Sequence, residues 1–164
     1  MPTSLPVPIE FSLPEGWLPA RPESGDPGVA FAAVHPHPDT GFAANITVDG
    51  GFPPDGTTLA ALAAESVRRL AAVADSVTVD GYHEFGSAEA PALTQRLAFR
   101  ALAGETHRDL VQSQVYLSLV DIEEPRKRGV IRLALTATSA QHDHVVGGFQ
   151  EFLRSVRPGT GKAA

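Results

Sequence analysis

The sequence contains no cysteine in its 164 residues. This absence excludes disulfide bonds, cysteine-ligated zinc, iron–sulfur clusters and catalysis by a thiol. Small secreted domains usually carry disulfide bridges, so a chain without cysteine is typical of a reducing compartment. The composition therefore predicts a cytoplasmic protein.

Long apolar runs and an excess of positive charge are also missing. No apolar stretch approaches the ~20 residues that a membrane-spanning helix needs. The first residues, MPTSLPVPIEFSLPEGW, have neither the basic start nor the apolar core of a signal peptide. The net charge is −6, which disfavours a phosphate backbone or an anionic membrane as partner. We expect no membrane insertion and no nucleic-acid partner.

What is present is the composition of an ordinary globular protein, with 43% hydrophobic and 20% charged residues. The length suits one domain with a sizeable buried core. We predict a single domain over residues 1–158, followed by a flexible tail over residues 159–164, GTGKAA.

Most of the chain alternates apolar and polar residues, the pattern of half-buried strands. The predicted strands are residues 7–13, 29–34, 42–48, a short strand within 76–86, 90–102, 108–120 and 129–139. Residues 14–28 are rich in proline and glycine and predict a loop. The last two strands are joined by a short segment with Pro125 and Gly129, which suits a hairpin and therefore antiparallel pairing.

Two segments have the three- and four-residue apolar spacing of amphipathic helices. The first covers residues 59–74 and can be capped by Thr57 or Thr58. The second begins at SAQHDHVVGG, where Ser139 is the expected N-cap and Asp143 lies near the helix start. The fold class predicted from these elements is α+β, with an antiparallel sheet of about six to seven strands packed with two main helices. We expect one apolar face of the sheet to be buried against both helices.

The histidines provide the main argument for metal chemistry. On a helix, His142 and His144 lie about 200° apart around the axis, so they cannot chelate one ion. His35, His37 and Asp39 have the spacing of ligands on an extended chain, but the prolines between them favour a solvated turn. We predict no catalytic residues, no metal and no cofactor.

The order strand–strand–strand–helix–strands–helix resembles the PsbP-like fold. The segments that carry the resemblance are IEFSLPEGW, with Trp17 after a Pro–Glu–Gly turn, then FAANITV, the hairpin LVQSQVYLSLV…GVIRLALTATS and the closing FLRSVRP. Members include an extrinsic photosystem subunit, a Ran-binding nuclear import factor, actinobacterial LpqN-type lipoproteins and Eag-type secretion chaperones. The resemblance implies an antiparallel sheet packed with helices and a protein that binds partners without turning over a substrate. The lipid-attachment cysteine of the lipoproteins is missing, so their surface location is not implied.

The leading hypothesis is a non-enzymatic binding or chaperone-like adaptor module that uses the polar face of the sheet. Arginine and tyrosine are enriched where proteins bind one another. The residues predicted to bind a protein partner are Arg96, Arg100, Gln112, Gln114, Tyr116 and Arg132, with Asn45, Thr47 and Thr136 on the same face. Each could also be an ordinary solvated residue of an antiparallel sheet. A homodimeric structural protein and a small histidine-dependent metal enzyme remain as alternatives.

Overall fold

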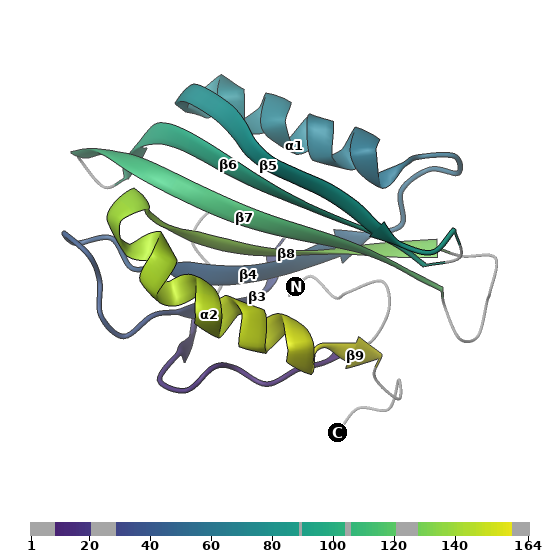
Figure 1. Cartoon of the computed structure of the whole chain (residues 1–164), viewed down its shortest axis with the longest axis horizontal. Coiled ribbons are helices and arrows are strands. Elements are labelled where there is room, and N and C mark those ends of the chain that lie inside the picture. The colour runs from purple at the N-terminus through teal and green to yellow at the C-terminus, as the bar shows by residue number, and fades with distance from the viewer. Residues whose placement is uncertain (1–8, 21–28, 89, 104–105, 121–127, 159–164) are drawn as a thin grey trace.

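The computed structural model describes residues 9–20, 29–88, 90–103, 106–120 and 128–158 (Figure 1). Its centre is a seven-stranded antiparallel sheet of order β2-β3-β4-β8-β7-β6-β5. The strands are β2 (Leu18–Ala20), β3 (Val29–Val34), β4 (Asn45–Gly51), β5 (Asp75–Gly86), β6 (Pro91–Ala103), β7 (Thr106–Val120) and β8 (Arg128–Thr138). The helices are α1 (Leu59–Val73) and α2 (Ser139–Ser155). The predicted fold class is confirmed.

The two helices cover opposite faces of the sheet. On β7, Tyr116 packs with Leu59 and Ala63 of α1, whereas its neighbour Val115 belongs to the cluster around Phe149 of α2. Successive side chains of a strand point to opposite faces, so α1 and α2 must lie on opposite sides. α1 lies over β5, β6 and β7, and α2 lies over β7 and β8 (Figure 1). The prediction that both helices cover one apolar face is wrong, because the sheet has an apolar patch on each side.

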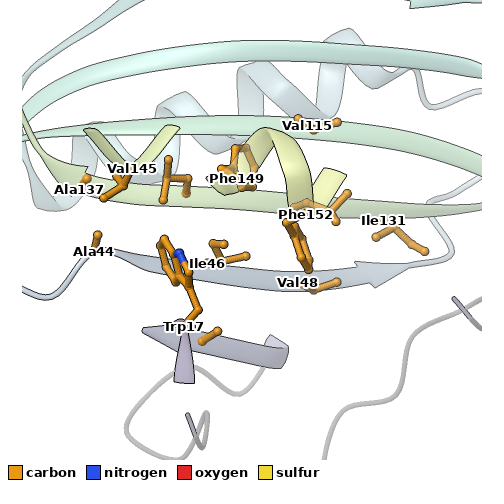
Figure 2. Close-up of a cluster of buried hydrophobic side chains, with 13 residues drawn as sticks. Trp17, Ala44, Ile46, Val48, Val115, Ile131, Ala137, Val145, Phe149 and Phe152 are labelled. Carbon is orange, nitrogen blue, oxygen red and sulfur yellow. The ribbon is translucent and has the colours of Figure 1, made fainter. Parts of the chain in front are cut away.

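The larger hydrophobic core lies between α2 and the β4–β8 side of the sheet. Leu133 and Leu135 are fully buried there. Ile46 is also fully buried and belongs to the same cluster as Phe149 and Phe152 (Figure 2). The smaller cores lie on the α1 face, around Leu93 and Leu97 of β6. The helix starts fit this packing: Thr58 caps α1 as predicted, through Ala61 N, but Thr138 and not Ser139 caps α2, through Gln141 N. The predicted N-cap of α2 was thus one residue late.

The N-terminal segment forms much less strand than its alternation predicts. Only β1 (Ile9–Glu10) is a strand, and it pairs with β9 (Arg157–Pro158) outside the main sheet. Phe11 nevertheless packs edge-on against Phe31 and Phe152, with ring centroids 4.9 and 5.1 Å apart. The alternation therefore indicated burial correctly and strand pairing incorrectly. Residues 7 and 8 of the predicted strand, and the predicted tail 159–164, lie outside the described residues.

Trp17 closes the N-terminal side of the larger core. Its backbone N–H donates to Pro14 O at 3.2 Å, and Gly16 has the positive φ of +87° that this turn requires. The indole is buried and points toward β4 and α2 (Figure 2). The region 14–28, expected to be a loop, contains the short edge strand β2 directly after this turn; residues 21–28 lie outside the described part. No helix in the described ranges combines the length and apolarity needed to cross a membrane.

Two adjacent glycines of α2 have very different surroundings and provide a test of this packing. A Cβ on Gly148 would lie 3.3 Å from Trp17 Nε1, whereas a Cβ on Gly147 would meet no atom within 4 Å. Gly147→Leu is expected to stabilise the protein by about 0.5–1 kcal/mol through helix propensity. Gly148→Leu is expected to destabilise it by about 1–3 kcal/mol through overpacking. Urea denaturation of both variants measures the difference, and equal effects would show that Trp17 does not pack on α2.

Candidate functional site

The six residues predicted to bind a partner do not share one surface. Gln112, Gln114, Tyr116 and Arg132 lie on the α1 face, whereas Arg96 and Arg100 lie on the α2 face. The reason is the β6–β7 register, in which Arg96 is opposite Ser113 and Gln95 is opposite Gln114. Directly opposed residues share a face, so the arginines of β6 and the glutamines of β7 point away from each other. The single polar face of the prediction is therefore wrong.

Arg96 and Arg100 are exposed and each is paired with an aspartate. Arg96 Nε lies 2.8 Å from Asp80 Oδ1, and Arg100 Nη1 lies 3.3 Å from Asp109 Oδ1. The hydrogen bond to Asp80, followed by the charge of that carboxylate, raises the pKa of Arg96 above its ordinary value. Exposed pairs of this kind contribute about 0–1 kcal/mol to stability. They occupy a part of the α2 face that α2 does not cover.

On the α1 face, a buried chain of polar side chains runs beneath the helix. Gln95 Nε2 donates to Ala63 O of α1 at 3.1 Å and to Gln114 Oε1 at 2.7 Å. Gln114 Nε2 donates to Ser66 Oγ at 2.9 Å, and the Tyr116 hydroxyl donates to Gln114 Oε1 at 3.0 Å. Burying these amides without partners would be costly, so the hydrogen bonds fix where α1 sits on the sheet.

The chain of polar contacts ends at an ion pair between Arg132 of β8 and Asp49 of β4. The two residues are directly opposed, and Arg132 Nη2 lies 2.6 Å from Asp49 Oδ2. Arg132 Nη1 also donates to Ser66 Oγ at 3.3 Å. Burial has the largest effect on the pKa of Arg132 and lowers it, but Asp49 and Tyr116 together raise that pKa above its ordinary value. Arg132 is therefore a fixed, half-buried positive charge.

A hollow of about 400 Å³ opens directly above this pair, between α1 and the segment that follows β4. We call it the flank hollow. Arg132, Tyr116 and Phe52 lie in its lining, and the surface of Phe52 is 50% exposed. Its lining residues are Asp49, Gly50, Gly51, Phe52, Pro53, Leu62, Glu65, Ser66, Arg69, Tyr116, Val130 and Arg132.

A second hollow of about 820 Å³ lies at the start of α1, where β5 ends and β6 begins. We call it the end hollow. It shares Phe52, Pro53 and Val130 with the flank hollow, so the two meet at the segment after β4. Its lining is Phe52, Pro53, Pro54, Asp55, Gly56, Thr57, Thr58, Leu59, Glu84, Phe85, Pro91, Ala92, Ser118, Arg128 and Val130.

Two of the histidines, His35 and His142, have hydrogen-bond partners within the described residues. His35 Nδ1 accepts from the backbone N–H of His37 at 3.1 Å, and the Asp39 carboxylate accepts from Thr138 Oγ1 at 2.5 Å. His142 is buried, with Nε2 3.0 Å from Ser113 Oγ, whereas His144 is exposed. Among the described residues, no three histidine, aspartate or glutamate side chains lie close enough together to hold a metal ion.

Solved structures share this arrangement of strands and helices. LpqN of Mycobacterium tuberculosis, described as involved in cell envelope biogenesis, superposes with a TM-score of 0.62 at 12% identity, over 92% of this chain and 84% of that chain. The yeast Ran-binding protein Mog1p superposes with a TM-score of 0.57 at 14% identity, over 92% of this chain and 89% of that chain. CyanoP, the PsbP of Synechocystis, superposes with a TM-score of 0.55 at 18% identity, over 92% of this chain and 86% of that chain.

The chain has the PsbP-like fold. The resemblance predicted from its motifs is thus confirmed. No protein-family model and no curated protein sequence matches the chain. At these identities the likeness establishes the fold alone, and the chemistry of the chain depends on its own side chains.

Sequence reasoning missed several residues of the flank hollow, namely Asp49, Phe52 and Ser66. Asp49 and Phe52 stand in a glycine- and proline-rich segment, DGGFPP, that indicates only a loop. Ser66 lies on the buried side of α1 among alanines, where one polar residue in an apolar stripe was the available signal. What these residues contact depends on the register of β4 with β8, which no local pattern contains.

The ion pair can be tested by a double-mutant cycle. Asp49→Asn leaves the half-buried guanidinium of Arg132 without its carboxylate, and we expect a loss of about 1–2 kcal/mol. This is less than the ~3–5 kcal/mol of fully buried pairs, because both groups retain contact with solvent. Arg132→Met alone leaves Asp49 unpaired. The double variant is expected to lose less unfolding free energy than the two single variants together, by at least about 0.5 kcal/mol. Strict additivity in chemical denaturation would refute the coupling.

Proposed function

We propose that this PsbP-like chain is a non-enzymatic binding module, acting as a chaperone-like adaptor, that holds a protein partner at the flank hollow. The observation that carries the proposal is the meeting of Arg132, Tyr116 and Phe52 at one concave site. Aromatic and arginine side chains in a partly desolvated pocket are the common energetic centre of protein interfaces. The fold supports the proposal, since Mog1p is described as Ran-binding.

The flank hollow suits a partner side chain that is mainly apolar and carries one polar group. Phe52, Leu62 and Val130 offer apolar contacts, and Arg132 is held rigidly enough by Asp49 to donate a hydrogen bond without reorganising. Rigid groups lose little conformational entropy on binding. The cysteine-free composition supports a cytoplasmic location for this interaction.

Two neighbouring arginines of α1 allow a matched test. Arg69 lines the flank hollow and Arg68 does not, although both are exposed and both pair with Glu65. A photo-reactive phenylalanine analogue placed at Phe52 is expected to form a discrete adduct with one protein in the cells that make this chain. Arg69→Glu should reduce that adduct at least about fivefold, as the loss of ~1 kcal/mol at an interface predicts, and Arg68→Glu should leave it unchanged.

The same analogue at Leu102, which is 60% exposed and lines neither hollow, is the control for non-specific reaction. An adduct pattern identical at the two positions, or equal effects of the two arginine variants, would contradict a binding site at the flank hollow. Mass spectrometry of the adduct identifies the partner.

Self-association through β5 is the second candidate function. β5 is a twelve-residue edge strand of the sheet, and Val79, Tyr82 and Phe85 on it are exposed. An edge with exposed apolar side chains can pair with another chain. Sedimentation equilibrium is expected to show a dimer that Val79→Lys dissociates. A monomer at all concentrations up to about 100 μM, which is well above the Kd of a stable dimer, would remove this candidate.

A further inference from the structure

The second half of β5, residues 81–86, is the regular part of an open sheet edge (Figure 1). β5 keeps one register with β6 over this stretch, because both of its irregularities lie before Gly81. No described strand pairs with its outer side, and residues 82–86 are all exposed. The residues of this segment constrain how a second strand can add to the edge.

Pro91 of β6 determines which backbone groups of β5 face outward. Gly86 is opposite Pro91, which has no N–H, so these two residues cannot exchange a pair of hydrogen bonds. Bonded and non-bonded pairs alternate along an antiparallel ladder. The bond from Ser87 N to Ala90 O, at 3.3 Å, agrees with this alternation. The residues whose N–H and C=O groups point away from β6 are therefore Tyr82, Glu84 and Gly86.

The side chains of the segment divide between the two faces of the sheet. Tyr82 and Glu84 lie on the α1 face, and His83 and Phe85 lie on the α2 face. The rings of His83 and Phe85 stack with their centroids 5.8 Å apart. On the other face α1 leaves the edge open, since Tyr82 is 49% exposed. A strand that adds here therefore meets a tyrosine and a carboxylate on one face and two stacked rings on the other.

Charge decides the register in which two copies of β5 can pair. A two-fold axis at His83 or at Glu84 aligns most of the regular segment with its copy. An axis at Glu84 places this carboxylate directly opposite its own copy, and directly opposed like charges are destabilising. An axis at His83 avoids this contact. It places Asp80, which is paired with Arg96 of its own copy at 2.8 Å, opposite the uncharged Gly86.

With the axis at His83, the contacts on both faces are complementary. On the α1 face, Tyr82 of each copy is opposite Glu84 of the other, where a phenol hydroxyl can donate to a carboxylate. On the α2 face, Phe85 of each copy is opposite Gly81 of the other, in a non-bonded pair, where side chains lie closest. An aromatic ring opposite a glycine covers the backbone that the glycine exposes. The segment is therefore self-complementary in this register.

We propose that two copies of this chain join their sheets through residues 81–85 of β5, in antiparallel orientation, with His83 on the two-fold axis. This inference rests on the proposed self-association through β5 and specifies its register and its contacts. It is independent of the flank hollow, because no residue that lines the flank hollow lies on β5.

The absence of cysteine allows a direct test of the register. The variants His83→Cys, Tyr82→Cys and Glu84→Cys each place one thiol at an exposed position. Oxidised glutathione accepts the electrons that are released when a disulfide forms. His83→Cys is expected to give a linked dimer, because its Cα atoms lie about 4.5 Å apart across the axis. The other two positions are diagonal to their copies, at roughly 7–8 Å, and should not link. Leu102→Cys, 60% exposed on β6, is the control for random collision.

An exchange of two residues tests the predicted contact on the α1 face. Tyr82→Glu places a carboxylate opposite Glu84 twice in each dimer, and should weaken dimerisation about tenfold in sedimentation equilibrium. Combining Tyr82→Glu with Glu84→Tyr places a hydroxyl opposite each carboxylate again and should restore the dimer. Thr78→Glu, exposed on β5 but outside the paired stretch, is the matched control and should leave the dimer unchanged.

Three results would overturn the proposal. Linkage through Glu84→Cys or Tyr82→Cys in preference to His83→Cys would refute the register and leave self-association standing. A double exchange that fails to restore the dimer would refute the contact between Tyr82 and Glu84. A chain that stays monomeric up to about 100 μM would show that the edge serves another protein or none, and would remove self-association as well. The adduct at Phe52 tests the flank hollow separately.

Discussion

The pairing of β7 with its two neighbours is the constraint on which the rest of the structure depends. β7 pairs with β6 and β8 along most of its length, and this register decides which residues of three strands share a face. Because side chains alternate, it places Val115 under α2 and Gln114 and Tyr116 under α1. Each helix covers part of one face, so each face keeps an uncovered part beside its helix. The flank hollow lies beside α1 on one of these parts.

The interior beneath α1 is polar where the interior beneath α2 is apolar. Gln95, Gln114 and Ser66 are all buried and all hydrogen-bonded. Such a network adds little net stability compared with a well-packed apolar layer, but every misplacement of α1 would leave an amide unsatisfied. The helix position therefore depends on hydrogen-bond geometry. The same geometry holds Arg132 and Tyr116 in the wall of the flank hollow.

The PsbP-like fold supplies the scaffold but not the chemistry of the hollows. The similar solved structures share less than a fifth of their residues with this chain over most of its length. Fold and function separate readily, since binding residues stand on loops and helix ends that a scaffold tolerates in many forms. Here the segment after β4, with Phe52 and its prolines, joins the flank and end hollows. In the proposed function, the specificity of this chain depends on that segment and on the strand ends near it.

The sequence by itself determined both helices and most strands of the sheet, because each of these depends on neighbours within a few residues. The spacing of Leu59 and Ala63 marks α1, and the alternation around Val115 marks β7. Only the tertiary structure decided which faces those elements share. Arg96 and Gln114 have equivalent places in two alternating patterns, yet they point to opposite sides of the sheet because of one register. The N-terminal alternation shows the same limit, since burial of Phe11 against Phe152 follows from its pattern but strand pairing does not. Contacts between residues far apart in the chain decide the strand register, the placement of the helices and the hollows. A local sequence pattern does not contain information on these contacts.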